Sequence, residues 1–297
     1  MTTAQPEGAS TGGPTVLRIL LGAHLRKLRE DKGVTREAAG YEIRSSESKI
    51  SRMELGRVSF KERDVADLLT LYGLTDEEER TALLTLARDA NTPGWWHRES
   101  DILPSWFQPY VGLESAATII RTYELQFVPG LLQTADYARA VILLGHGKAQ
   151  PSELERRVSL RLARQKQLTR PDPPQLWAVI DEGALRRLVG GAEVMRAQIA
   201  ALIDATKMPN VQLQVIPFDF GGHAAAGGSF SILRFPDQEL PDIVYVEQLA
   251  SALYLDKRED VEHYVVAMEQ LAVEANPPGE TAETLGLILR ELDARTV

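Results

Sequence analysis

The sequence predicts two folded parts, a mostly α-helical domain at residues 15–90 and an α+β domain at residues 115–297. In the first part, apolar residues recur at spacings of three and four, which is typical of amphipathic helices. After the proline-rich stretch at 171–174, apolar and polar residues begin to alternate, as they do in half-buried strands. Helices followed by strands favour an α+β domain on a small sheet of roughly four or five strands. The length of 297 residues suits two domains with separate cores.

The composition limits where such a protein acts. The chain has no cysteine, so disulfides and thiolate metal sites are excluded, which fits a reducing compartment. It has no apolar run near the ~18 residues of a membrane span. Residues 1–14 are rich in Thr, Gly, Ala and Pro and lack the order of a secretory signal, so we expect a disordered arm. We therefore expect a cytoplasmic protein that makes no membrane contact.

Five helices are predicted within residues 15–90. They cover Val16–Asp31, two short segments between residues 35 and 56, Asp64–Tyr72 and Asp76–Asp89. Thr35 and Ser46 are expected to cap the two short helices, because a hydroxyl can accept an orphan backbone N–H. Glycines at 33 and 56 would end the first and third helices. Thr75 would cap the fifth helix, with an acid three positions later completing a capping box.

The two short helices are expected to pack on each other and to leave a polar outer face. The apolar contacts would come from Ala39, Ile43, Ile50 and Met53. Gly40 would lie where the helices come closest, since a larger side chain would push them apart. The polar residues left outside are Glu47, Ser48, Lys49, Ser51 and Arg52.

With these features, the stretch resembles the helix-turn-helix of the phage-repressor/Cro group, the XRE family. The resemblance extends upstream through residues 21–29 and 33–35 and downstream through residues 51–57. Two departures stand in the turn: where the family usually has glycine and then an apolar residue, this chain has Arg44 and Ser45. We expect Arg44 to adopt a positive φ, which is uncommon outside Gly, Asn and Asp.

The resemblance implies binding to double-stranded DNA. The expected DNA-binding residues are Arg36, Ser46, Glu47, Ser48, Lys49, Ser51 and Arg52. Arg36 and Lys49 would hold phosphates. Glu47, Ser48 and Arg52 would face base edges, where Arg favours guanine and Glu favours cytosine. Because one such domain buries little surface, we expect a homodimer on a palindromic operator with half-sites about one helical turn apart.

Charge is unevenly distributed along the chain. The net charge is −9, yet residues 15–63 hold twelve Lys and Arg against seven Asp and Glu. A basic module on an acidic body suits a DNA-binding protein, because counterion release from DNA drives much of the affinity. The acidic body would repel DNA elsewhere and help to orient the module.

Residues 91–114 are predicted to be a linker, because Asn91-Thr92-Pro93-Gly94 breaks the helical pattern. The linker carries five aromatic residues: Trp95, Trp96, Trp106, Phe107 and Tyr110. Such rings can stack on bases or on a ligand. We favour instead a wedge that packs one domain onto the next.

The second domain is expected to alternate helices and strands. The predicted helices are Gly112–Tyr123, Gln133–Leu144, Ser152–Thr169, Glu182–Leu188, Glu193–Ala205, Val261–Ala275 and Thr281–Ala294. The predicted strands are Leu176–Ile180, Val211–Pro217, Phe230–Phe235, Ile243–Glu247 and Ala252–Leu255.

Motifs in this part are similar to an uncharacterised C-terminal domain of the DUF5753 type. They are Tyr-Glu-x-Gln-x-Val-Pro-Gly-Leu-Leu-Gln-Thr-x-x-Tyr-Ala-Arg at 123–139, Arg-x-x-Arg-Gln at 161–165, Asp-Glu-x-Ala-Leu-Arg at 181–186 and Val-Ile-Pro-Phe at 215–218. Such domains follow XRE heads in actinobacterial regulators, including WhiJ-like proteins of Streptomyces. The resemblance implies a developmental or antibiotic regulator, often encoded beside a small acidic partner protein.

An effector pocket is expected in the second domain, because a few residues there combine aromatic walls with polar groups. These candidates are Tyr123, Phe127, His223, Phe230 and Glu247. Glu247 has two interpretations: a buried carboxylate paired with Arg157 or Arg161, which we favour, or a surface acid. The glycine-rich stretch 221–228 lacks the lysine and hydroxyl of a P-loop and is predicted to be a mobile loop. The five histidines lack metal-ligand spacing, so we expect no metal, no cofactor and no catalytic residue.

Two functions of different class remain open. One is a dimeric transcriptional regulator whose second domain senses a small molecule or a small acidic partner protein. The other is an enzyme or antitoxin-like binding protein, related to nucleotides or nicotinamide cofactors, that carries a DNA-binding head. The first is the favoured interpretation.

Overall fold

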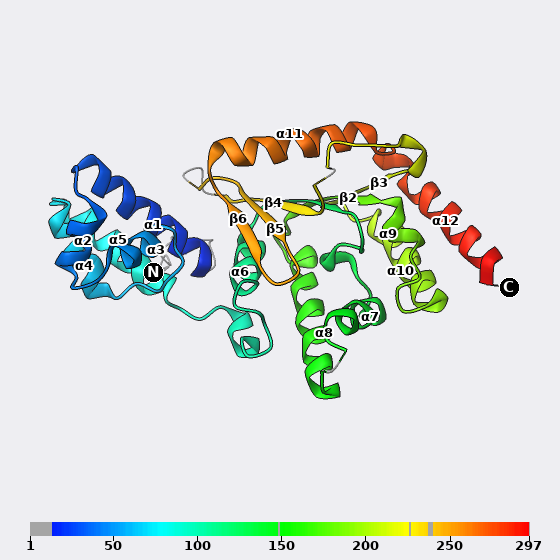
Figure 1. The fold of residues 1–297 in the computed structure, drawn as a ribbon, viewed down its shortest axis with the longest axis horizontal. Helices are drawn as coiled ribbons and strands as arrows, with labels where there is room; N and C mark the ends of the chain where they lie inside the picture. Colours follow the sequence, from blue (N-terminus) through cyan, green and yellow to red (C-terminus); the bar gives the residue numbers. More distant parts are fainter. Residues whose placement is uncertain (1–13, 148, 226, 237–239, 297) are drawn as a thin grey trace, which may run out of the picture. The chain divides into compact units, whose positions relative to one another are not determined.

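The computed structural model describes residues 14–147, 149–225, 227–236 and 240–296, drawn as a ribbon in Figure 1. The expected disordered arm falls on residues outside this range, apart from Pro14, which begins the first helix. The chain divides into two compact units, one of residues 14–97 with Pro236 and Leu240, and one of residues 98–235 and 241–296. The first is helical and the second combines helices with a sheet, which confirms the predicted fold class. Among the helices so described, none combines the length and apolar composition needed to cross a bilayer.

Five helices build the first unit. They are α1 (Pro14–Asp31), α2 (Arg36–Glu42), α3 (Glu47–Glu54), α4 (Glu62–Leu71) and α5 (Glu77–Ala90). Their apolar faces meet in one core, which includes Leu21, Leu25, Ile50, Phe60 and Leu68. The helical spacing in the sequence therefore located all five elements to within a few residues.

The helix caps follow the predicted chemistry at two of three places. Thr35 accepts a hydrogen bond from the Ala38 amide at 3.1 Å, and Ser46 accepts one from the Lys49 amide at 3.3 Å. The predicted Thr75 cap is wrong. Asp76 caps α5 instead and accepts from the Glu79 amide at 2.8 Å, because a carboxylate is a good acceptor beside the positive end of a helix dipole.

Two glycines let the backbones of the first unit approach closely. A Cβ on Gly40 would lie 3.0 Å from the Ser45 carbonyl oxygen, which confirms that Gly40 marks the closest approach of α2 to the start of α3. A Cβ on Gly22 would lie 2.5 Å from the Met53 carbonyl oxygen. Because Gly22 is in the middle of α1, this contact fixes the distance between α1 and the last turn of α3.

A six-stranded sheet forms the centre of the second unit, in the order β3-β2-β1-β4-β5-β6. Its strands are β1 (Ile119–Glu124), β2 (Gln175–Asp181), β3 (Val211–Ile216), β4 (Phe230–Arg234), β5 (Ile243–Glu247) and β6 (Ala252–Leu255). The first three are parallel to one another, whereas β4, β5 and β6 each pair antiparallel with the preceding strand in the order.

The central strand β1 is where the sequence prediction was wrong. A helix was expected at Gly112–Tyr123, but the helix there, α6 (Gln108–Ala116), ends before β1 begins. The residues Ile119-Ile120-Arg121-Thr122-Tyr123 are mostly β-branched or aromatic, which favours a strand. The sheet therefore has six strands instead of four or five.

The remaining helices cover the two faces of this sheet (Figure 1). They are α7 (Ala135–Gly145), α8 (Pro151–Gln165), α9 (Glu182–Arg186), α10 (Ala192–Ala205), α11 (Arg258–Glu274) and α12 (Thr281–Thr296). Met268 and Leu271 of α11 pack on one face against Tyr123, Phe230 and Val244. In Figure 1, α6 and α8 lie on the opposite side of the sheet from α11.

The aromatic residues predicted as an interdomain wedge divide between the two units. Trp95 and Trp96 belong to the first, where their rings meet edge to face at 6.0 Å. Phe107 and Tyr110 belong to the second, where Tyr110 packs against Tyr245 with ring centroids 4.2 Å apart. Each group thus takes part in the packing of its own unit.

The close approach of α1 to α3 predicts an unusual response to a helical glycine substitution. Gly22→Ala should lower the free energy of unfolding of the first unit by about 1–3 kcal/mol, because the added methyl overlaps the Met53 carbonyl. In Gly286→Ala on α12, the new Cβ meets nothing closer than 3.7 Å. That control should gain about 0.5–1 kcal/mol from helix propensity. Denaturant unfolding measures both values, and stabilisation by Gly22→Ala would contradict the packing.

Candidate functional site

The third helix presents one apolar face to the core and one polar face to solvent. Ile50 and Met53 are buried, whereas Glu47, Ser48 and Arg52 are exposed. The Arg52 Nε donates to the Ser48 carbonyl oxygen of the same helix at 3.3 Å. Within the described chain Arg52 forms no ion pair, so its guanidinium is held only by its own helix. The short α3 thus carries a row of solvent-facing hydrogen-bonding groups.

The two residues expected to hold phosphates are engaged with acids of the same unit. The Arg36 Nε lies 2.9 Å from a Glu54 carboxylate oxygen, and the Lys49 Nζ lies 2.6 Å from an Asp64 oxygen. Both cations are half-buried, while Ser46 is exposed and Ser51 is half-buried. Contact with DNA phosphate would therefore require Arg36 and Lys49 to exchange one anionic partner for another.

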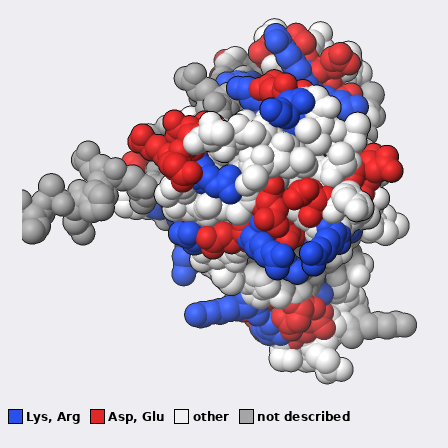
Figure 2. Space-filling model, turned by 90° about the vertical axis from the view of Figure 1, so that its left-hand side faces the viewer, with Lys and Arg blue, Asp and Glu red and all other residues white. Residues whose placement is uncertain are grey.

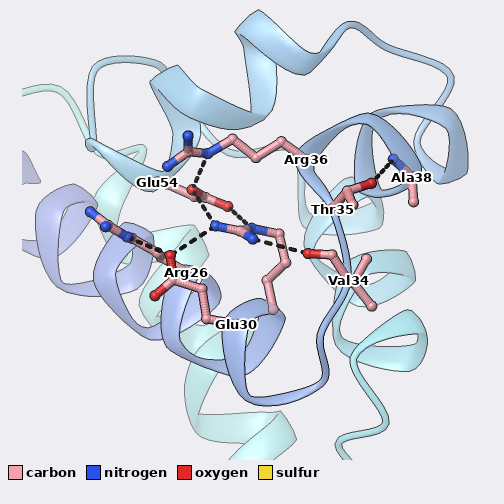
Figure 3. A network of polar contacts seen from close by, with 8 residues as sticks. Arg26, Glu30, Val34, Thr35, Arg36, Ala38 and Glu54 are labelled. Carbon is pink, nitrogen blue, oxygen red and sulfur yellow. Dashed lines mark hydrogen bonds and ion pairs between the residues drawn. The ribbon is translucent and has the colours of Figure 1, made fainter.

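A buried carboxylate at the end of α3 joins three helices. Glu54 is 6% exposed and accepts hydrogen bonds from Arg29 on α1 and from Arg36 on α2. Figure 3 shows Glu54 at the centre of this network, with Arg36 approaching it from α2. The Arg29 guanidinium also donates to the Val34 carbonyl oxygen at 2.9 Å. The hydrogen bond to Glu54 raises the pKa of Arg29.

The sequence contained a signal for this network that the pattern analysis missed. Glu54 lies four residues after Ile50 and next to Met53, which places it on the inward side of α3. An acid at such a position needs a buried counterion, because an unpaired buried charge is costly. Arg29 stands on the inward stripe of α1 and could have been named as that partner.

The turn before α3 has the backbone conformation expected from its sequence. Arg44 has a φ of 52°, which confirms the predicted positive value. The turn is closed by the Arg44 amide, which donates to the Tyr41 carbonyl at 3.0 Å, and by the Ser45 amide, which donates to the Gly40 carbonyl at 2.7 Å. Arg44 itself is exposed.

The basic character of the first unit is local. Residues 15–63 carry the excess of Lys and Arg, but over residues 15–90 there are fourteen Lys and Arg against fourteen Asp and Glu. The acids of α4 and α5 offset the bases of α1–α3. Figure 2 accordingly shows Lys and Arg interspersed with Asp and Glu on the face it draws. Any attraction to DNA must therefore come from where individual cations lie, since the net charge of the whole unit is zero.

Three of the five effector candidates come together in the second unit. The Tyr123 hydroxyl lies 3.0 Å from the His223 Nε2, and the Tyr123 and Phe230 rings are 6.1 Å apart. The Ala225 amide donates to the His223 Nδ1 at 3.2 Å, so Nε2 carries the proton in the neutral ring and donates to Tyr123. Beside them is a pocket of about 240 Å³, lined by the glycine-rich loop, by Phe230 and by His263 and Tyr264 of α11.

The other two candidates lie elsewhere. Strand register places Glu247 on the opposite face of the sheet from Phe230, because side chains alternate along a strand. Phe127 is half-buried in the segment after β1. The expected ion pair of Glu247 with Arg157 or Arg161 is wrong. Glu247 accepts from the Tyr245 hydroxyl at 2.8 Å, Arg157 pairs with Glu153, and Arg161 donates to Gln133.

The face that carries Glu247 holds a further carboxylate that the sequence analysis did not single out. Extending the strand register by one or two residues aligns Glu124 of β1, Ser229 and Glu247 of β5 in one row across the sheet. Burial raises the pKa of Glu124 to about 7, partly opposed by a hydrogen bond from Ser229. Burial likewise lowers the pKa of Arg161 to about 10. This row could not be predicted while residues 112–123 were expected to form a helix, because residues of a helix have no cross-strand neighbours.

Comparison with known proteins finds two family models along the chain. One describes a helix-turn-helix domain and matches residues 20–83. The other describes a domain of unknown function, DUF5753, and matches residues 107–286. No curated protein and no solved structure matches the chain.

The Glu54 network predicts a large effect from loss of a single charge. Glu54→Gln should lower the free energy of unfolding of the first unit by about 3 kcal/mol, because Arg29 would lose its buried counterion and keep only the half-exposed Glu30. Glu62→Gln is the matched control. Its pair with Arg88 is about half exposed on both sides, and such exposed pairs add little to stability. Thermal and denaturant unfolding measure the difference, and equal effects of the two variants would contradict the role of Glu54.

Proposed function

The chain belongs to the DUF5753 family and carries a helix-turn-helix domain ahead of that domain, and we propose that it is a dimeric, sequence-specific regulator of transcription. The observation that carries the proposal is the geometry of α3. This helix is capped and anchored by buried groups, while its outer face presents Glu47, Ser48 and Arg52 to solvent. In proteins with this motif, the second helix lies in the major groove and its N-terminal residues contact base edges.

Base reading would fall on these three exposed residues. Arg52 suits guanine, whose O6 and N7 accept two parallel hydrogen bonds, and Glu47 suits the amino group of cytosine. To contact a base, Arg52 would lose only its hydrogen bond to the Ser48 carbonyl oxygen of its own helix. Ser46, Ser48 and Ser51 would add hydroxyl contacts to bases or phosphates, since a hydroxyl both donates and accepts.

We propose that Arg36 and Lys49 also bind DNA phosphates, and that each leaves its present carboxylate partner when it does so. Glu54 retains Arg29 if Arg36 swings away, so its carboxylate does not become an unpaired buried charge. The Lys49–Asp64 pair is partly exposed, and pairs of that kind hold their partners weakly. A phosphate can therefore compete for both cations at modest cost.

We expect a dimer because the DNA-contacting surface of one α3 is small. An α3 of eight residues spans only part of one groove, and two-fold dimers of such domains contact two half-sites about one helical turn apart. We assign dimerisation or effector sensing to the second unit.

The pocket beside Tyr123, His223 and Phe230 supports a sensing role for the second unit. It lies at the C-terminal end of β1, where the chain has crossed from β3 back to β4 on the other side of β1. Ligands of open α/β sheets bind at such reversals of strand order. A small molecule is the occupant that this pocket favours, and a small acidic partner protein remains the second candidate effector.

Arg52→Ala tests the DNA-reading assignment. The variant should lose its footprint on the native promoter while its unfolding transition stays unchanged, because among the described residues Arg52 has no ion pair and no side-chain hydrogen bond beyond its own helix. Lys207→Ala is the charge-matched control on the second unit, where Lys207 pairs with Asp204 on an exposed surface. A protected promoter in Arg52→Ala would refute the assignment.

A thermal-shift screen of the full chain tests the sensing role. Nucleotides, nicotinamide cofactors and small acidic proteins are suitable probes. A bound ligand at ~100-fold over its Kd should stabilise the protein by ~2.7 kcal/mol. The shift should disappear in His263→Ala, because His263 lines the pocket, and persist in His146→Ala, because His146 does not line it. Turnover of a hit would favour the enzyme alternative, and an equal shift in both variants would exclude this pocket.

A further inference from the structure

Four successive helices of the first unit end in the same backbone motif. After α1, α3 and α4, the residue in the left-handed conformation is Gly33, Gly56 or Gly73, with φ of 68°, 63° and 78°. Each of these glycines donates to a carbonyl three residues back, and the next amide donates to one five residues back. This pair of bonds is the common way to end a helix with glycine.

The second helix ends in this motif without glycine. Arg44 has a φ of 52° and makes the same pair of bonds to Tyr41 and, through Ser45, to Gly40. In the part of the chain that the structure describes, Arg44 is the one non-glycine residue with a positive φ. A Cβ in this conformation crowds the backbone, whereas glycine adopts it freely. The chain therefore uses a strained residue where it uses glycine three other times.

Among the described residues, no interaction of the Arg44 side chain offsets the energetic cost of this backbone conformation. The Arg44 side chain is exposed, and among the described residues it forms no ion pair or side-chain hydrogen bond. Arg36 and Lys49, by contrast, are tied to Glu54 and Asp64. A backbone held in a rare conformation without a structural benefit points to a function for the side chain.

The position of Arg44 indicates what that function is. Arg44 stands two residues before Ser46, the cap of α3, so its guanidinium projects from the turn that leads into the DNA-facing helix. If the start of α3 enters a major groove ~12 Å wide, a residue just before it lies at the rim, where the phosphates run. Arginine binds phosphate through a planar fork of donors.

We propose that Arg44 binds a backbone phosphate of duplex DNA at the rim of the groove occupied by α3. This inference rests on the proposed DNA-binding function. Of the three cations proposed to bind phosphate, Arg44 is thus the one that gives up no ion pair among the described residues, and it positions α3 on the duplex without reading bases.

Arg44→Gly in the full chain separates this role from a structural one, because the two effects have opposite signs. Removing the Cβ should raise the melting temperature by a few degrees. At the same time, affinity for a fluorescein-labelled 30-base-pair duplex should fall about tenfold at physiological salt. The slope of log affinity against log salt should become shallower by about 0.9, the contribution of one phosphate contact.

Two further variants control for charge and strain. Arg44→Lys keeps the cation and the strained Cβ, so its melting temperature and salt slope should match those of the wild type. Arg88→Ala removes an exposed arginine of α5, a helix that packs on α1 and α4. Its salt slope should also be unchanged.

The outcomes distinguish the inference from the function on which it rests. If the wild-type chain binds no duplex in a salt-dependent way, the proposed function itself fails. If it binds and Arg44→Gly binds with the same affinity and slope, the phosphate contact is refuted. If Arg44→Gly and Arg44→Asn both lose affinity with a lowered melting temperature, Arg44 is structural and the inference is overturned.

Discussion

The first unit depends on the buried carboxylate of Glu54, which ties the last turn of α3 to Arg29 of α1 and Arg36 of α2. A buried charge is tolerated only when its partners hold it in good geometry, so these three helices are constrained to one mutual arrangement. Gly22 adds a steric constraint at the same place, because the α1 backbone contacts the Met53 carbonyl. The core fixes the inner face of α3 and the network fixes its end. The outer face is then left free for recognition.

This arrangement explains how an acidic protein can present a DNA-reading surface. The first unit has no net positive charge over residues 15–90, and six of its fourteen Lys and Arg are paired with acids among the described residues. Non-specific attraction is therefore expected to be modest, and the unpaired arginines beside α3 become decisive. Phosphate contacts raise the affinity for all DNA sequences alike. A protein with few of them therefore binds its operator more tightly relative to other DNA.

Local chemistry was predictable from the sequence, and long-range pairing was less so. The Thr35 and Ser46 caps and the positive φ of Arg44 depend on a few neighbouring residues. The sixth strand was missed because β1 is central and its residues alternate too little to exclude a helix. Glu247 was assigned to the same pocket as Phe230, although a single step along a strand moves a side chain to the opposite face. Glu54 was missed because its counterion lies 25 residues away in the sequence.

The central claim is that the outer face of α3 selects DNA by sequence. The most direct measurement is to capture sheared genomic fragments with the full-length protein at physiological salt and to sequence what is retained. The account predicts a shared motif with two-fold symmetry, its half-sites about one helical turn apart. Retained fragments that match the input in sequence content, with no common motif, would contradict it.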